Sequence, residues 1–236
     1  MAKIVISQPM FFPWVGLFEQ IILADTYVHY NTVQFPVGRS LMNRVQIKTS
    51  NGSQWLTIPI KRQGIQYINQ VEIDYNQNWQ DKHLKTLQQN YSKSPFFVDM
   101  LDIVSSIYNK KFKYLSDLNI CSIEYISNYF TIKTQFIESS QYSFESSSSE
   151  LLLNITESLN GDTYITGHGA KKYLEHIIFE KKGISVEYMN YERVSYPQLY
   201  GEFTPFVSVL DLIANLGKEG KAVMLSKTIN WQEFVK

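Results

Sequence analysis

The alternation of apolar and polar positions near the N-terminus predicts a β-α-β unit. The β-branched run at residues 3–7 is typical of a strand buried on both faces of a parallel sheet. Pro9 and Pro13 end this strand, because proline lacks a backbone N–H and fixes φ. The apolar residues of 14–24 fit a buried helix, with Pro13 in its first turn. A second strand is expected at residues 26–30, joined by a right-handed crossover.

The middle of the chain first alternates and then changes to helical spacing. Residues 45–49 and 54–58 flank a Ser-Asn-Gly-Ser turn, which predicts a β-hairpin. Residues 68–73 alternate too, and we expect them to add a third strand to the hairpin. Apolar spacings of three and four then predict successive helices. The sequence thus predicts an antiparallel insertion over about residues 43–75 and a helical layer over about residues 79–130.

The C-terminal half returns to alternating strands and helices, a pattern that builds a parallel sheet. We expect helices at residues 150–159, 171–180 and 205–216, and strands at residues 134–138, 163–166 and 184–189, the last of these being the final strand. Between them, four consecutive serines in residues 142–149 predict a mobile loop. The expected fold class is α/β, with a mostly parallel Rossmann-like central sheet in a single domain over residues 1–236.

Composition excludes some function classes. The 22 basic and 22 acidic residues balance to a formal charge of +0, so no overall field directs the chain to nucleic acid or an anionic membrane. No signal peptide and no membrane-spanning apolar run is evident. The single Cys121 and four scattered histidines provide neither a disulfide framework nor a zinc template. We therefore expect a cytoplasmic protein without a metal site.

The connection after the first strand is the expected ligand position. Open α/β sheets bind ligands beyond the carboxyl ends of their strands, next to helix N-termini. Here that position contains polar Gln8, the flat rings of Phe12 and Trp14, and Gly16, which permits close approach to the backbone. These features suit a nucleotide or a sugar. The same aromatic residues would equally serve to seal the core.

Two residues are candidates for catalysis. His168 stands beside Gly167 at a predicted strand-to-helix turn, where an imidazole that titrates near pH 7 is a useful base. A surface histidine in a turn has the same pattern. Asp211 lies in an apolar helix, where a buried carboxylate needs either a ligand or hydrogen-bonding neighbours.

The loop before the hairpin offers a second group of polar residues. Arg39, Asn43 and Arg44 lie in this loop, and guanidinium groups form paired hydrogen bonds to phosphate oxygens. The sequence therefore predicts a diphosphate clamp here, with a solvated loop as the alternative.

Two long motifs, QPMFFPWVG at residues 8–16 and FTPFVSVLD at residues 203–211, rarely arise by chance. Shorter segments accompany them in order along nearly the whole chain: residues 24–25, 33–35, 43–47, 55–59, 91–97, 163–169 and 198. Together these segments resemble the WbqC-like proteins of bacterial surface-polysaccharide gene clusters. The chain departs from that pattern at Asn31, where an acidic residue is expected, and at Thr166 and Gly167, where Asn-Pro-like residues are expected.

The resemblance implies an enzyme that N-acylates or aminoacylates the amine of a nucleotide-linked sugar, with acyl-CoA or another activated acyl donor. It adds Gln34, Gln198 and Ser208 to the candidate substrate contacts. Such a transfer needs a base and donors for an oxyanion, and the sequence contains candidates but no complete triad. Two alternatives stay open: nucleotidyl transfer, although no His-x-Gly-His occurs, and non-catalytic sugar binding for another transferase. Whether the chain forms a homo-oligomer also stays open.

Overall fold

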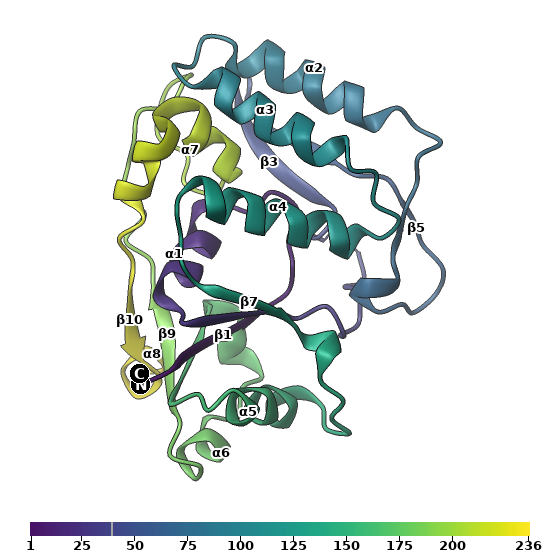
Figure 1. The fold of residues 1–236 in the computed structure, drawn as a ribbon. Helices are drawn as coiled ribbons and strands as arrows, with labels where there is room; N and C mark the ends of the chain where they lie inside the picture. The colour runs from purple at the N-terminus through teal and green to yellow at the C-terminus, as the bar shows by residue number, and fades with distance from the viewer. Residues whose placement is uncertain (39) are drawn as a thin grey trace.

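The computed structural model describes residues 1–38 and 40–236, which fold around a six-stranded sheet (Figure 1). The strand order is β10-β9-β8-β1-β2-β7. Every pairing in this sheet is parallel except that of β10 with β9. The mostly parallel α/β fold is therefore confirmed. The strands are β1 (Lys3–Ser7), β2 (Thr26–His29), β7 (Gln135–Glu138), β8 (Thr163–Thr166), β9 (Ser185–Asn190) and β10 (Lys227–Asn230).

The strand order creates a switch point between β1 and β8. The chain proceeds from β1 to β2 and β7 on one side, and then returns to the other side of β1 for β8 and β9. This is the order of a doubly wound Rossmann-type sheet. Because the connections after β1 and β8 leave in opposite directions, a crevice forms beyond their carboxyl ends, where such sheets bind ligands.

Helices cover both faces of the sheet (Figure 1). Side-chain alternation in β1 sends Val5 to one face and Ile4 and Ile6 to the other, so β1 is buried on both sides. The Val5 face belongs to the same apolar cluster as α1 (Val15–Leu23), α4 (Leu115–Tyr129) and α7 (Val209–Leu216). Helices α2 (Trp79–Tyr91) and α3 (Phe97–Tyr108) extend this cluster as an outer layer, farther from the sheet (Figure 1). The opposite face is covered by α5 (Ser148–Ser158), α6 (His176–Glu180) and α8 (Trp231–Phe234). Among the described residues, each helix is too short or too polar to cross a lipid bilayer.

The predicted hairpin forms, but the predicted third strand is wrong. Strands β3 (Arg44–Thr49) and β4 (Gly52–Thr57) pair with each other alone. The segment expected to join them forms a 3₁₀-helix, η1 (Ile68–Gln70), followed by β6 (Glu72–Ile73). Strand β6 pairs with β5 (Ile60–Lys61) in a separate small sheet.

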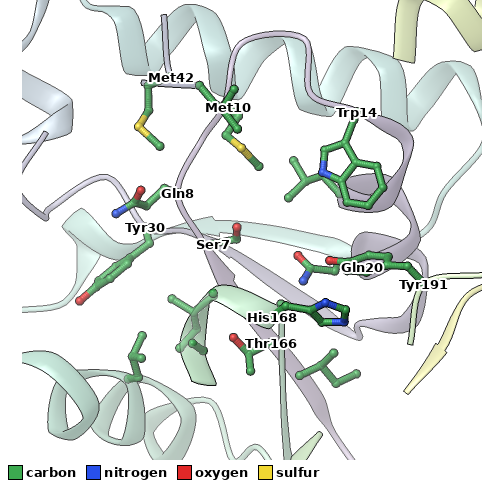
Figure 2. Close-up of a pocket in the computed structure, with 18 of the residues that line it drawn as sticks. Ser7, Gln8, Met10, Trp14, Gln20, Tyr30, Met42, Thr166, His168 and Tyr191 are labelled. Atoms are coloured by element: carbon green, nitrogen blue, oxygen red, sulfur yellow. The ribbon is translucent and has the colours of Figure 1, made fainter. Parts of the chain in front are cut away.

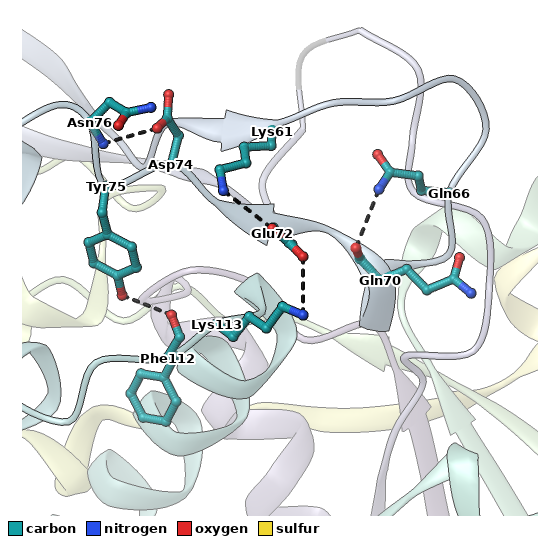
Figure 3. Close-up of polar contacts among 9 residues, drawn as sticks. All are labelled: Lys61, Gln66, Gln70, Glu72, Asp74, Tyr75, Asn76, Phe112 and Lys113. Carbon is teal, nitrogen blue, oxygen red and sulfur yellow. Dashed lines mark hydrogen bonds and ion pairs between the residues drawn. The ribbon is translucent and has the colours of Figure 1, made fainter.

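Local hydrogen bonds and ion pairs explain this difference. The backbone N–H groups of Ile68 and Asn69 donate to carbonyls in the loop after β2, so they are not available to the hairpin. Glu72 then forms ion pairs of 3.3 Å with Lys61 and with Lys113 (Figure 3). These contacts hold β6 beside β5 and the start of α4.

Two predictions about the segments around β8 need correction. Residues 171–180 do not form one helix, but a 3₁₀-helix, η3 (His168–Lys172), and the short α6. They separate because the Ser149 hydroxyl accepts from the Glu175 N–H at 3.0 Å and donates to the Tyr173 carbonyl at 3.3 Å. The end of the serine run is therefore not loop, since Ser149 belongs to α5 and is 1% exposed.

The C-terminal segment also differs from expectation. The strand at residues 184–189 is not the last, because β10 pairs antiparallel along the outer edge of β9 and covers it. Helix α7 begins four residues later than predicted, since the Ser208 hydroxyl accepts from the Leu210 N–H and caps it. Two further 3₁₀-helices are η2 (Ser139–Gln141) and η4 (Gly217–Val223).

His83 connects the helical layer to the hairpin. It lies on α2, where its Nε2 donates to the Thr57 carbonyl at 3.1 Å and its Nδ1 accepts from the Tyr108 hydroxyl at 2.9 Å. A neutral imidazole satisfies both contacts. Burial lowers the pKa of His83 to about 4, although the bond to Thr57 opposes the shift.

This histidine should make stability depend on pH. Because the folded pKa lies below the unfolded one, the unfolded chain binds more protons between them, and stability is lost as pH falls from about 6.5 to about 4. The loss attributable to His83 should be about 3 kcal/mol. Urea unfolding of wild type and His83→Gln at pH 7.5, 6, 5 and 4 measures it, and we expect a shallower decline in the variant. Parallel curves for the two proteins would contradict this assignment.

Candidate functional site

A cavity of about 600 Å³ opens beyond the carboxyl ends of β1 and β8 (Figure 2). Ile6 and Ser7 at the end of β1 line it, as do Ile165 and Thr166 at the end of β8. The cavity therefore occupies the switch point of the sheet, and we call it the switch-point cavity. Its polar lining consists of Ser7, Gln8, Gln20, Tyr30, Thr166, His168, Tyr173, Tyr191 and Arg193.

The charge of this lining restricts the ligand. Within the described part of the chain, no aspartate or glutamate lines the cavity. Arg193 contributes a cation at the exposed edge, where its guanidinium stacks over Phe206 at 5.1 Å. Burial raises the pKa of Tyr30 to about 12, so its hydroxyl stays protonated as a hydrogen-bond donor. The cavity suits a neutral or anionic ligand.

His168 lies in η3, directly after β8, and its side chain is exposed. Its Nε2 is 2.7 Å from the carbonyl oxygen of Met189. A carbonyl only accepts, so Nε2 carries the proton, and Nδ1 of the neutral ring keeps a free lone pair. Ring contacts with Tyr191 at 5.1 Å and Phe234 at 4.8 Å hold the imidazole in place. His168 is thus held in a tautomer that can act as a base.

Gln20 and Tyr191 lie next to His168 (Figure 2). Gln20 is only 5% exposed, and its amide forms no hydrogen bond with another described residue. A Cβ at Gly167 would lie 3.1 Å from the Gln20 Nε2 and 3.4 Å from the Tyr191 hydroxyl, so both polar groups converge over this glycine. Burial raises the pKa of Tyr191, which keeps its hydroxyl protonated. The site therefore presents two donors beside one base.

The loop between β1 and α1 forms one wall of the cavity and is held by buried hydrogen bonds. Phe12 has a φ of 36°, a left-handed conformation that costs energy for a residue with a side chain. The Ser208 hydroxyl donates to the Phe12 carbonyl at 2.8 Å. Asn119 of α4 donates to the carbonyls of Pro9 at 3.0 Å and Met42 at 2.8 Å. Helices α4 and α7 thus fix the loop in its strained form.

The side chain of Trp14 explains why residue 16 is a glycine. The indole lies over Gly16 and leaves no room for a Cβ there, so the group that approaches this backbone is the chain's own side chain. The indole also contacts Tyr191 at 4.9 Å and Phe206 at 5.4 Å between ring centroids. Of the aromatic candidates, Trp14 lines the cavity, whereas Phe12 is fully buried in the core.

The structure places Asp211 away from the cavity. Its buried carboxylate accepts hydrogen bonds from the Tyr91 hydroxyl at 2.9 Å and the Tyr196 hydroxyl at 3.0 Å. Burial raises the pKa of Asp211, and these hydrogen bonds oppose the rise. Gln198 joins the same network, donating to the Tyr196 hydroxyl and accepting from Lys48, both within 3.1 Å. These residues connect α7 to α2 and β3.

The remaining candidates divide between the core and the surface. Ser208 is fully buried at the start of α7, and Asn43 donates to the Ile58 carbonyl at 3.0 Å within the hairpin. Gln34 is exposed and bridges to Tyr67, outside the cavity. Arg39 lies outside the described residues. Arg44 lines a second, smaller hollow described below.

Of the site residues predicted from the sequence, the structure therefore brings four together in the switch-point cavity: Gln8, Trp14, Gly167 and His168. Sequence reasoning missed Gln20 and Tyr191. The sequence contained a signal for Gln20, since Gln20 and its neighbour Glu19 are the polar residues of an otherwise apolar helix. The sequence contained no signal for Tyr191, because no local pattern indicates that the end of β9 lies beside α1.

The comparisons with known proteins identify the family of the chain. A family model described as the WbqC-like protein family matches residues 8–223, a range that contains the whole polar lining except Ser7. The chain belongs to the WbqC-like family. This WbqC-like protein is also 33% identical over 223 residues to an uncharacterized protein of Mycobacterium tuberculosis, covering 93% of this chain and 96% of that protein. No solved structure matches it.

Asn119 should stabilise the cavity wall of this WbqC-like protein. The Asn119→Ala substitution leaves the Pro9 and Met42 carbonyls without a donor, so we expect a loss of about 1–3 kcal/mol in the free energy of unfolding. The Phe11 amide, which donates to Leu41 across these loops, should exchange with solvent faster.

Ser122→Ala is the matched control, because Ser122 is buried on the same helix but donates only to the Asn119 backbone carbonyl. It should lose less stability and keep the Phe11 amide protected. Equal exchange at Phe11 in both variants would show that Asn119 does not hold the loop.

Proposed function

We propose that this protein N-acylates or aminoacylates the amine of a nucleotide-linked amino sugar bound in the switch-point cavity. The observation that carries the proposal is the convergence of one base, His168, with two free donors, Gln20 and Tyr191, at the ligand-binding end of the sheet. The resemblance to WbqC-like proteins of polysaccharide gene clusters supports the substrate class. We place the reaction in the cytoplasm, as a step in bacterial surface-polysaccharide (O-antigen) biosynthesis.

The residues present supply the parts of an acyl transfer. The sugar amine attacks the carbonyl carbon of acyl-CoA or a similar activated donor, and the carbonyl oxygen becomes an oxyanion. The Gln20 amide and the Tyr191 hydroxyl stabilise that charge. Nδ1 of His168 takes the proton from the attacking nitrogen. Collapse of the intermediate forms the amide and expels the thiolate, which receives the proton.

The lack of carboxylates in the described lining of the cavity favours acyl transfer to an amine. Only the neutral amine is a nucleophile, and a nearby carboxylate would stabilise its protonated form. No carboxylate lines the described cavity, so the amine is not held as an ammonium ion. Trp14, Tyr30 and Tyr191 provide flat faces for a sugar ring, and Arg193 at the edge suits a phosphate.

The His168→Gln variant tests the base. Glutamine keeps a donor for the Met189 carbonyl but cannot accept a proton, so kcat should fall about 10²- to 10⁴-fold with little change in KM. Thiol release from acyl-CoA, measured with a panel of nucleotide-linked amino sugars, is the assay.

His176→Gln is its control, since His176 contacts Tyr188 and Trp231 away from the cavity. It should keep wild-type turnover. Full activity in His168→Gln would remove the proposed base. Sugar binding by wild type without turnover of any acyl donor would favour the non-catalytic binding function.

The glycines beside His168 provide a second test. In Gly167→Ala the new methyl group would press on Gln20 at 3.1 Å and displace its amide, and we expect turnover to fall roughly 10- to 100-fold. In Gly169→Ala the methyl group meets nothing within 4 Å, so turnover should fall far less. Neither glycine needs a positive φ, so both variants should fold. Equal activities in the two variants would contradict the requirement for the Gln20 amide at its position over Gly167.

A further inference from the structure

A second hollow, of about 280 Å³, adjoins the switch-point cavity, and we call it the annex. The two share Met10, Trp14, Leu41 and Phe206 as lining residues. The annex continues from this shared wall to Arg44 on the β3–β4 hairpin. Its volume is close to the lower limit of about 300 Å³ for small-molecule sites, which suits one ring system.

Arg44 and Trp55 form the end of the annex. The pairing of Gln46 with Trp55 and of Arg44 with Thr57 makes Arg44 and Trp55 diagonal neighbours on one face of the hairpin. The Arg44 guanidinium stacks over the Trp55 indole at 4.1 Å from the ring centroid. It forms no hydrogen bond or ion pair with another described residue, and its Nε is buried.

This combination restricts what the annex can bind. A hydrocarbon chain would fit the apolar wall but would leave the guanidinium donors without acceptors. A phosphate would satisfy the guanidinium but would place its charge against an apolar wall. A flat ring that carries carbonyl oxygens can both stack on the aromatic side chains and accept hydrogen bonds from Arg44.

We propose that the annex binds the oxo-substituted base of the nucleotide carrier, a uracil, thymine or guanine ring held by Trp55 and Arg44. The sugar end of the same molecule then lies in the switch-point cavity beside His168. This inference rests on the proposed function, since it names the part of the substrate that the annex takes. It assigns Arg44 to base recognition instead of the diphosphate clamp that the sequence suggested.

Binding of free nucleotides tests the annex separately from catalysis. Dissociation constants for UMP, TMP, GMP, AMP and ribose 5-phosphate are measured by calorimetry or ligand-detected NMR on wild type. We expect UMP, TMP or GMP to bind at least about tenfold more tightly than AMP, whose base has no carbonyl, and than ribose 5-phosphate, which has no base.

Two variants and one control locate the site. Trp55→Leu and Arg44→Gln should each weaken binding of the preferred nucleotide about tenfold or more and leave ribose 5-phosphate binding unchanged. Arg62→Gln is the matched control, because Arg62 stacks over Phe35 at 5.7 Å near the hairpin but does not line the annex. It should keep wild-type affinity.

Three results would overturn the assignment. The first is equal binding of UMP and ribose 5-phosphate with loss of both in Arg44→Gln, which makes Arg44 a phosphate clamp. The second is Trp55-dependent binding of a short acyl thioester that has no base, without nucleotide binding. The third is nucleotide binding unchanged in both annex variants, or no nucleotide binding at all.

The turnover assay keeps the two proposals distinguishable. If nucleotide binding depends on Arg44 and Trp55 but no acyl donor is consumed, the result supports base binding in the annex and contradicts the proposed acyl transfer. If turnover requires His168 while Trp55→Leu leaves the KM for the nucleotide-linked sugar unchanged, the result supports the proposed acyl transfer and contradicts base binding in the annex.

Discussion

The position of β1 in the middle of the sheet is the constraint on which the rest of the structure depends. It is buried on both faces and paired in parallel with β2 on one side and β8 on the other. Parallel neighbours require crossover connections, and the connections after β1 and β8 leave in opposite directions. The crevice that results brings Gln8 and Gln20 of the N-terminal unit close to His168, which lies far along the chain.

Buried polar groups then convert this crevice into a shaped site. Asn119 ties two loops of the wall together, and Ser208 both caps α7 and binds the carbonyl of the strained Phe12. Asp211 gathers the hydroxyls of Tyr91 and Tyr196 in the core behind them. Leaving one partner of a buried hydrogen bond unpaired destabilises the fold by more than the bond itself stabilises it. Loop conformations that break these bonds are therefore disfavoured.

The two hollows that meet at Trp14 and Phe206 have different chemistry. The switch-point cavity offers hydroxyl, amide and imidazole groups, whereas the annex offers aromatic faces and one guanidinium without a described partner. A nucleotide-linked sugar has the same division, with a polyhydroxylated ring at one end and a flat base at the other. Of the aromatic residues in the QPMFFPWVG segment, Trp14 lines both hollows and Phe11 lines the annex, whereas Phe12 packs in the core.

The sequence by itself determined the local elements and one part of the site. Periodicity located β1, α1, the hairpin and helices α2 to α4, because spacing along the chain reports which face of an element is buried. It also placed His168 at a strand-to-helix turn. Only the tertiary structure decided the rest. The edge pairing of β10, the hydrogen bonds of Asp211 with Tyr91 and Tyr196, and the convergence of Gln20 with Tyr191 depend on contacts between distant segments. Local periodicity carries no information about which distant surfaces meet.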